Sequence, residues 1–306
     1  TMFKNFCPSA LGINGRQSEL IELALTYAFR GMDVDMHDML RRSQRTSFDD
    51  ASKYLKASEI KIGSFQLAID LDSDDDTFTA AVAQLHPLGE IAQQLGAERA
   101  LIRVPAATNR LPFNEFFDVQ RNRLGQIADV LGQREIKLGI GFRAGAELLE
   151  GKEFTFVNNV ETFRALVDAV PNDNVGYVID TWDWVVGDGA MDQLSEISGE
   201  KIVALRLGSV PEEADLATVK STDRLLPELN GMTLDHVKVV SHLNETNFSG
   251  PMSPTASTSQ YKGQTREFLV QKSQEAIDGI CKEAGMTVAP LPMDLIEDIP
   301  YEPTPM

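Results

Sequence analysis

The run NVGYVID at residues 174–180 decides the fold. It is apolar along almost its whole length and ends in an acidic residue, which is typical of a strand covered on both faces in a parallel sheet. Three further runs of this kind flank it in the sequence: RALIRVP (99–105), KLGIGF (137–142) and KIVALRLG (201–208). Helically spaced apolar residues lie between the runs, as Phe163, Leu166, Val167 and Val170 do just before NVGYVID. We therefore predict buried parallel strands that alternate with helices.

The alternation continues toward both ends of the chain. Weaker strand candidates are SALGI (9–13), MDVD (32–35), IKIGSFQLAI (60–69) and GPMSP (250–254). Further helices are predicted after Ser18, over Ser47–Ala57, from the acidic cluster Asp72–Asp76 to Leu95 with a kink or break at Pro87, along Phe117–Leu131, over Leu234–Leu243 and along Leu269–Ala284. Eight strand candidates over about 250 residues match the count and size of a (β/α)8 TIM barrel, and a doubly wound sheet is the alternative.

The composition changes beyond Met286. The segment APLPMDLIEDIPYEPTPM contains five prolines and cannot continue a helix. We therefore predict an α/β chain with a single TIM barrel over residues 1–285, followed by an extended, acidic, Pro-rich arm over 286–306. The arm either hangs loosely or wraps the barrel or a second copy, which would make a homo-oligomer.

The charge balance excludes several classes of partner. Of 306 residues, 28 are Lys or Arg and 46 are Asp or Glu, which gives a formal net charge of −18. Such a surface repels nucleic acid and anionic membranes. Two cysteines rule out a disulfide framework or a Cys-built metal site. With no visible secretory signal and no long apolar run, we expect a cytoplasmic protein.

Three features resemble known motifs without matching them. GIGFRAG (139–145) has the wrong glycine spacing for a dinucleotide loop, and DLDSDDD (70–76) lacks the glycine and the final acid of a calcium loop. The four histidines form no close ligand pair. Of these we retain only His37, just past the second strand candidate, as a substrate-binding candidate.

Several segments together resemble the sugar phosphate isomerase/epimerase family of xylose isomerase-like TIM barrels. They are FRGMDVD (29–35), RLPFNEFFDVQRNRL (110–124), KLGIGFRAG (137–145), VGYVIDTWDWVVGDG (175–189), and most of residues 231–254 and 257–285. The resemblance covers roughly residues 10–285. It implies a site at the carboxyl ends of the strands, where active members bind a divalent metal such as Mn, Co, Mg or Zn.

Most of the metal ligands that the resemblance implies are replaced in this chain. The family uses a Glu, an Asp, a His and a Glu on strands five to eight, and the corresponding residues here are Gly141, Asp180, Arg206 and Thr255. A single carboxylate does not hold a metal, and a guanidinium stays protonated and cannot ligate. We therefore expect no metal cofactor, and we predict that Arg206 pairs with Asp180 in its place.

The remaining candidates are acids and cations around that position. Asp180 and Asp183 are the acid/base candidates. Substrate-binding candidates are Arg103, Arg143, Arg206, Trp182, His37 and Arg224, the last from the position of a family arginine in STDRLLPE. Converging arginines favour a sugar phosphate or sugar acid, unless each arginine pairs with a neighbouring carboxylate instead.

Two functions follow from the resemblance and the replacements. The first is an isomerase or epimerase that acts on a sugar or sugar phosphate by proton transfer at carbon. The alternative is a non-catalytic barrel, a pseudoenzyme, that binds an anionic sugar-like ligand. DNA-repair endonucleases share the barrel, but they need a zinc-binding His and Glu cluster that this acidic chain lacks.

Overall fold

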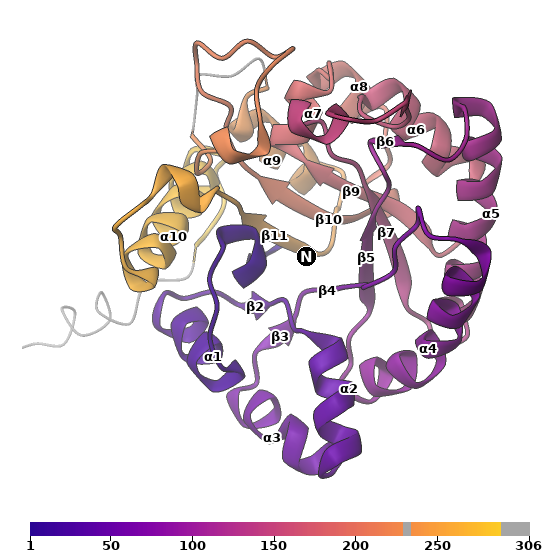
Figure 1. Cartoon of the computed structure of the whole chain (residues 1–306). Coiled ribbons are helices and arrows are strands. Elements are labelled where there is room, and N and C mark those ends of the chain that lie inside the picture. Colours follow the sequence, from indigo (N-terminus) through magenta and orange to yellow (C-terminus); the bar gives the residue numbers. More distant parts are fainter. Residues whose placement is uncertain (229–233, 289–306) are drawn as a thin grey trace, which may run out of the picture.

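A barrel of parallel strands surrounded by helices is the core of the computed structural model, which describes residues 1–228 and 234–288 (Figure 1). The main sheet has the order β3-β2-β1-β11-β10-β9-β7-β5-β4. Its strands are β1 (Phe3–Phe6), β2 (Gly31–Met32), β3 (Lys61–Ile62), β4 (Phe65–Gln66), β5 (Arg99–Arg103), β7 (Lys137–Gly141), β9 (Val175–Asp180), β10 (Ile202–Leu207) and β11 (Pro251–Pro254). A separate antiparallel pair joins β6 (Ala107–Thr108) to β8 (Phe154–Thr155).

The helices lie outside the strands in Figure 1. They are α1 (Gln17–Thr26), α2 (Met36–Arg45), α3 (Phe48–Ser58), α4 (Asp75–Gln94), α5 (Phe113–Gly132), α6 (Val160–Ala169), α7 (Thr181–Val186), α8 (Met191–Ser195), α9 (His236–Glu245) and α10 (Arg266–Glu283). Short 3-10 turns are η1 (Pro8–Leu11), η2 (Ala146–Leu149), η3 (Gly199–Lys201), η4 (Ser221–Asp223) and η5 (Thr258–Gln260). No described helix is both long and apolar enough to cross a membrane.

The barrel closes through a strand made of two pieces. β3 pairs with β2, and β4 pairs with β5, so the two ends of the sheet belong to one interrupted stretch. Gly63 and Ser64 form the interruption. A Cβ at Gly63 would collide with the Asn5 side chain, and both the N–H and the hydroxyl of Ser64 donate to Asp33. The topology is that of a nearly closed TIM barrel, which excludes the doubly wound alternative.

The inside of the barrel has an apolar layer below a polar one. Because side chains alternate along a strand, residues two apart share a face. Leu101, Val178, Val203 and Ala204 form a small buried cluster around Gly139, whose missing side chain makes room for it. Two residues further along their strands stand Arg103, Gly141, Asp180 and Arg206. The polar layer therefore lies at the carboxyl ends of the strands, where a TIM barrel carries its site.

The structure corrects several sequence expectations. The first strand is Phe3–Phe6, and residues 9–11 of the predicted strand SALGI belong to η1 instead. Helix α2 was not predicted. Pro87 does not split α4, which runs from Asp75 to Gln94. Residues 286–288 follow α10 without regular structure, and the rest of the predicted arm, 289–306, lies outside the described residues.

Candidate active site at the carboxyl ends of the strands

Two carboxylates stand at the end of β9. Asp180 is its last residue and caps α7, since its Oδ1 accepts from the backbone N–H groups of Trp182 at 3.1 Å and Asp183 at 3.3 Å. Asp183 lies in the first turn of α7, and its Oδ1 accepts from the N–H of Ala144 at 2.9 Å. Both side chains are buried. The switch from strand to helix thus brings residues 180 and 183 into one site.

Arg224 joins the two carboxylates. It follows η4, and its Nη1 donates to Asp180 Oδ1 at 2.8 Å, to Asp180 Oδ2 at 3.0 Å and to Thr255 Oγ1 at 2.9 Å. Its Nη2 donates to Asp183 Oδ2 at 3.2 Å. The guanidinium also stacks on the indole of Trp182, 4.9 Å from the ring centroid. One side chain from a loop therefore contacts groups at the ends of two strands, β9 and β11.

The predicted ion pair between Asp180 and Arg206 is wrong. Although the two residues are register partners on β9 and β10, Arg206 Nη2 lies 3.7 Å from Asp33 Oδ2 and 3.7 Å from Cys7 Sγ. Within the described residues, no ion pair joins Arg206 to Asp180. The reason is that Arg224 enters from the loop and contacts both oxygens of Asp180.

A cavity of about 300 Å³ opens above these groups. Asp180, Asp183 and Arg224 line it together with two further cations, Arg103 and Arg143. Arg103 is exposed and has no hydrogen-bond or ion-pair partner among the described residues, and the Nε of Arg143 is buried without one. The remaining lining is mostly small or hydroxyl side chains and glycine: Ser9, Ala10, Gly12, Ser221, Thr222, Thr255, Ala256, Ser257 and Thr258.

The charges of the site shift each other's protonation. Burial, with help from the Asp180 carboxylate, raises the pKa of Asp183 to about 6. Burial opposes ionisation of Asp180 too, but the charge and hydrogen bonds of Arg224, together with the charges of Arg103 and Arg206, lower the pKa of Asp180. Although Arg103 is exposed, the protein around it displaces part of its hydration, and this desolvation together with the charge of Arg206 lowers the pKa of Arg103 to about 10. Environments that separate two carboxyl pKa values are typical of acid/base pairs.

Two predicted substrate contacts lie elsewhere. Trp182 is fully buried and does not line the cavity, so it supports Arg224 rather than contacting the substrate as predicted. His37, on α2, accepts from the N–H of Ala68 at 3.1 Å, and burial lowers the pKa of its imidazole. His37 does not line the cavity. The structure thus brings together Asp180, Asp183, Arg103, Arg143 and Arg224, and it places Arg206 in a neighbouring cluster.

Sequence reasoning missed the centre of that neighbouring cluster, Asp33. Its carboxylate accepts from Asn5 at 2.8 Å and from the N–H and hydroxyl of Ser64, and it pairs with Arg206. Burial of Cys7 beside it raises the pKa of the thiol. The available signal was FRGMDVD, in which Asp33 is the acid that follows the second strand.

The side chains do not fit the metal that the resemblance implies. Among the residues described, no three His, Cys, Asp or Glu side chains are grouped so as to hold an ion. Asp180 and Thr255, two of the four carried-over positions, both bond to the Arg224 guanidinium instead. A positive group in contact with the remaining carboxylate opposes binding of a second cation there.

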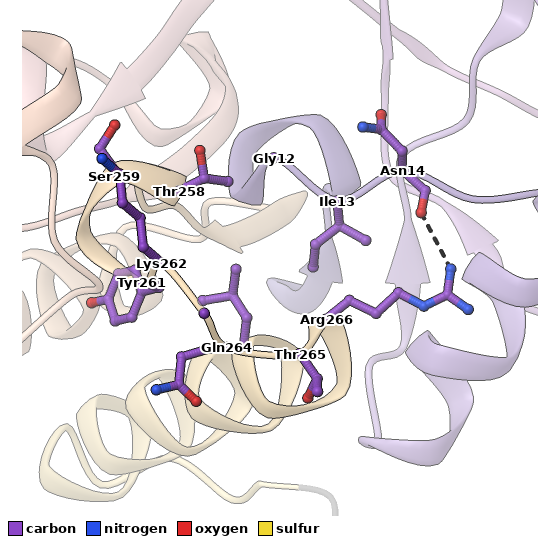
Figure 2. Close-up of a pocket in the computed structure, with 12 residues that line it drawn as sticks. Gly12, Ile13, Asn14, Thr258, Ser259, Tyr261, Lys262, Gln264, Thr265 and Arg266 are labelled. Carbon is purple, nitrogen blue, oxygen red and sulfur yellow. Dashed lines mark hydrogen bonds between the residues drawn. The ribbon is translucent and has the colours of Figure 1, made fainter.

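A second cavity, of about 400 Å³, adjoins the first and shares Gly12 and Thr258 with it. Figure 2 shows it between the segment after η1 and the start of α10. Arg266 is held there by the carbonyl of Asn14, to which its Nη1 donates at 3.3 Å, and by Glu19. No residue predicted for the site lies in this cavity.

Comparison with known proteins supports the fold and the resemblance. The family model described as xylose isomerase-like TIM barrel matches residues 21–280. The inosose isomerase of Bacillus velezensis is 20% identical over 281 residues, covering 90% of this chain and 96% of that protein.

Two solved structures have the same fold. A xylose isomerase domain protein from Alicyclobacillus acidocaldarius superposes with a TM-score of 0.82 at 16% identity, covering 93% of this chain and 100% of that one. The IOLI protein with a binding zinc atom superposes with a TM-score of 0.78 at 18% identity, with the same coverage. At these identities the likeness is one of fold.

Proposed function

This chain belongs to the xylose isomerase-like TIM barrel family, and from that premise we propose that it is an isomerase or epimerase. Its substrate would be a small sugar with an anionic group, a sugar phosphate or a sugar acid. The reaction would move a proton at a carbon next to a carbonyl group. The inosose isomerase similarity supports isomerisation in general, and the cavity supplies the argument for the anion.

One observation carries the proposal: a carboxyl group with a raised pKa and unpaired cations line the same cavity. Asp183, with a pKa of about 6, is close to the pH at which a general base both accepts and returns a proton efficiently. Arg103 and the Nε–H of Arg143 have no protein partner in the described chain. They would hold the anionic group of the substrate and orient the reacting carbon toward Asp183.

The residues divide the work as follows. In an isomerisation, Asp183 would remove the proton from carbon and return it to the adjacent carbon, while the hydroxyl proton moves between the two oxygens. In an epimerisation, Asp183 would remove the proton and solvent would supply one to the opposite face of the same carbon. Asp180, whose pKa is lowered by Arg224, stays ionised and holds that guanidinium in place. The positions that the resemblance gives to the family's metal ligands are expected to be replaced in this chain, so the proposed reaction uses no metal. That no cofactor is needed and that the protein is cytoplasmic stay predictions.

Proton exchange with solvent tests this function. The protein is incubated in deuterated buffer with a panel of keto- and aldo-sugar phosphates, sugar acids and inososes, and deuterium incorporation at carbon is followed by NMR. We expect enzyme-dependent incorporation into at least one anionic substrate. Asp183→Asn should slow it by about 10²–10⁴-fold. The matched control Asp188→Asn changes an acid in the turn after α7 that does not line the cavity.

A non-catalytic ligand-binding barrel is the second candidate. The observation that favours it is that Arg224 bonds to both carboxylates, so neither is free of a protein partner. Saturable binding of an anionic sugar with no deuterium incorporation from any compound of the panel would select this candidate and reject the isomerase.

A further inference from the structure

We propose that Arg224 is the resident cation of this site: its guanidinium supplies the positive charge that metal-dependent members of the family obtain from a bound ion. The assignment rests on where the guanidinium lies. It contacts Asp180 and Thr255, two of the four positions to which the family's metal ligands correspond. Asp180 ends β9 and Thr255 directly follows β11, and the sheet order places β10 between these two strands, so Arg224 spans the end of a whole strand.

The surroundings of Arg224 fix it in that position. Its carbonyl accepts from the N–H of Ser257 at 3.0 Å, and the next residue, Leu225, exchanges two backbone hydrogen bonds with Ser209. Only 12% of the side chain is exposed, and the Trp182 ring covers one face of the guanidinium. Removal of either side of this ion pair would leave a buried charge without a partner, which destabilises the fold. The contact is therefore built into the fold.

The guanidinium keeps donors for a ligand. Arginine has five N–H hydrogens in a planar fork. The bonds to Asp180, Thr255 and Asp183 use both Nη1 hydrogens and one on Nη2. The Nε–H and the second Nη2 hydrogen have no partner within residues 1–228 and 234–288. Since Arg224 lines the cavity, these donors are available to an oxygen of the bound molecule.

Those donors give Arg224 a chemical role, and this part rests on the proposed function. Removal of a proton next to a carbonyl builds negative charge on the carbonyl oxygen. A fixed guanidinium beside that oxygen stabilises the charge as it develops, in an enclosed site where the interaction is strong. Arg224 would thus be the electrophile of the reaction and Asp183 its base.

Removal of the Arg224 side chain, followed by rescue with free guanidinium ion, tests the assignment without any measurement of turnover. The variant Arg224→Met removes the charge, keeps an unbranched side chain and leaves two buried carboxylates uncompensated. We expect its Tm to fall by about 5–10 °C. Millimolar guanidinium, far below denaturing concentrations, should recover a large part of that loss. The wild-type Tm should be unchanged by EDTA or by Mn²⁺, Co²⁺ or Zn²⁺.

Two further variants make the test decisive. Arg164→Met removes a more exposed arginine that pairs with Glu196 at 2.8 Å, and guanidinium should not raise its Tm. The double variant Asp180→Asn/Arg224→Met lacks one of the uncompensated charges, so it should be more stable than Arg224→Met and should lose the rescue. If Arg224→Met does not fold, the rescue is measured by refolding it with and without guanidinium.

The outcomes separate this inference from the proposed function. One metal ion per wild-type chain, with a Tm that rises on binding, would overturn the resident cation. So would an Arg224→Met variant with the wild-type Tm, or one that guanidinium does not help. Cation rescue without any deuterium exchange would support the resident cation and reject the isomerase.

Discussion

Arg103 differs from Arg206 and Arg224, the paired arginines at the mouth of the barrel, because in the described chain it has neither a hydrogen-bond nor an ion-pair partner. Gly141, the residue that the resemblance aligns with the family's strand-five Glu, leaves space beside Arg103: a Cβ there would lie 3.7 Å from the Arg103 Cγ. An unpaired cation contributes little to folding and much to binding of an anion.

Arg103→Gln should therefore weaken binding without weakening the fold. We expect the Kd for inorganic phosphate, measured by calorimetric titration, to rise by about 10–100-fold. The Tm should stay within about 2 °C of wild type. Arg121→Gln, on the outer surface of α5, is the control and should change neither value. Equal phosphate binding by Arg103→Gln and wild type would remove Arg103 from the ligand site.

Asp183 gives the stability of the protein a particular pH dependence. Its folded-state pKa, about 6, is above the ordinary value of 3.8 for an aspartate, so the folded protein binds this proton more tightly. The resulting stabilisation is complete below the ordinary pKa and is lost as the pH rises through 6. Relative to Asp183→Asn, wild type should lose at most about 3 kcal/mol of unfolding free energy between pH 4 and pH 7.

Urea titrations of both proteins at several pH values measure this difference. Carboxylates far from Asp183 cancel from it, whereas Asp180 contributes to it because the Asp183 and Asp180 carboxyl groups shift each other's pKa. A difference that stays constant from pH 4 to pH 7 would mean that Asp183 is an ordinary ionised carboxylate and a poor base.

At the scale of single elements, β7 illustrates how one strand serves both layers of the barrel. A Cβ at Gly139 would lie 2.7 Å from Leu101 Cδ2 and 2.9 Å from Val178 Cγ2, inside the apolar cluster. At Gly141 the nearest atom, Val178 Cβ, is at an ordinary contact distance of 3.4 Å. The packing of the apolar cluster therefore requires glycine at position 139, whereas at position 141 the packing would accept a methyl group.

Paired alanine substitutions distinguish them. Gly139→Ala should destabilise the protein by about 1–3 kcal/mol, because the methyl group overpacks the cluster. Gly141→Ala should cost less than about 1 kcal/mol, and removal of backbone freedom offsets part of that. Chemical denaturation of the two variants checks this, and equal losses would show that the apolar layer can shift to accept a methyl group.

The elements that could be predicted from the sequence are those with an uninterrupted apolar run. β5, β7, β9 and β10 lie within the predicted runs. β1 was missed because its Lys4 and Asn5 resemble exposed residues, whereas the barrel buries both with partners more than 240 residues away. The proximity of Asp180 and Asp183 could be predicted because both stand at the end of the same predicted strand. The contact of Arg224 with Asp180 depends on the path of a long loop, so no local pattern indicates it.

At the scale of the whole molecule, a buried ion pair joins the first strand of the chain to its last described helix. Lys4 Nζ on β1 lies 2.7 Å from Asp278 Oδ1 on α10, and the side chains are 6% and 12% exposed. Gln274 donates to the other oxygen of Asp278. The first strand and the last helix are thereby connected in a region away from water.

Removal of one partner should be costly. Lys4→Met leaves Asp278 buried without its cation, and we expect a loss of about 3–5 kcal/mol in unfolding free energy. The double variant Lys4→Met/Asp278→Leu should recover much of this, because it removes the uncompensated charge as well. Urea unfolding measures both. A Lys4→Met variant within about 1 kcal/mol of wild type would show that water reaches Asp278.

The contact of Arg224 with Asp180 and Thr255 also bears on how the site obtains its positive charge. A metal ion must be acquired from a pool in which several ions compete. An ion that binds the site more tightly displaces one that binds it more weakly, even when the reaction needs the weaker one. A guanidinium that is part of the chain is made by translation, is present once per molecule and is not lost on dilution. If Arg224 is the resident cation, the protein would have no apo form and would not take up a wrong ion in place of the right one. It would keep working in cells that are starved of trace metals.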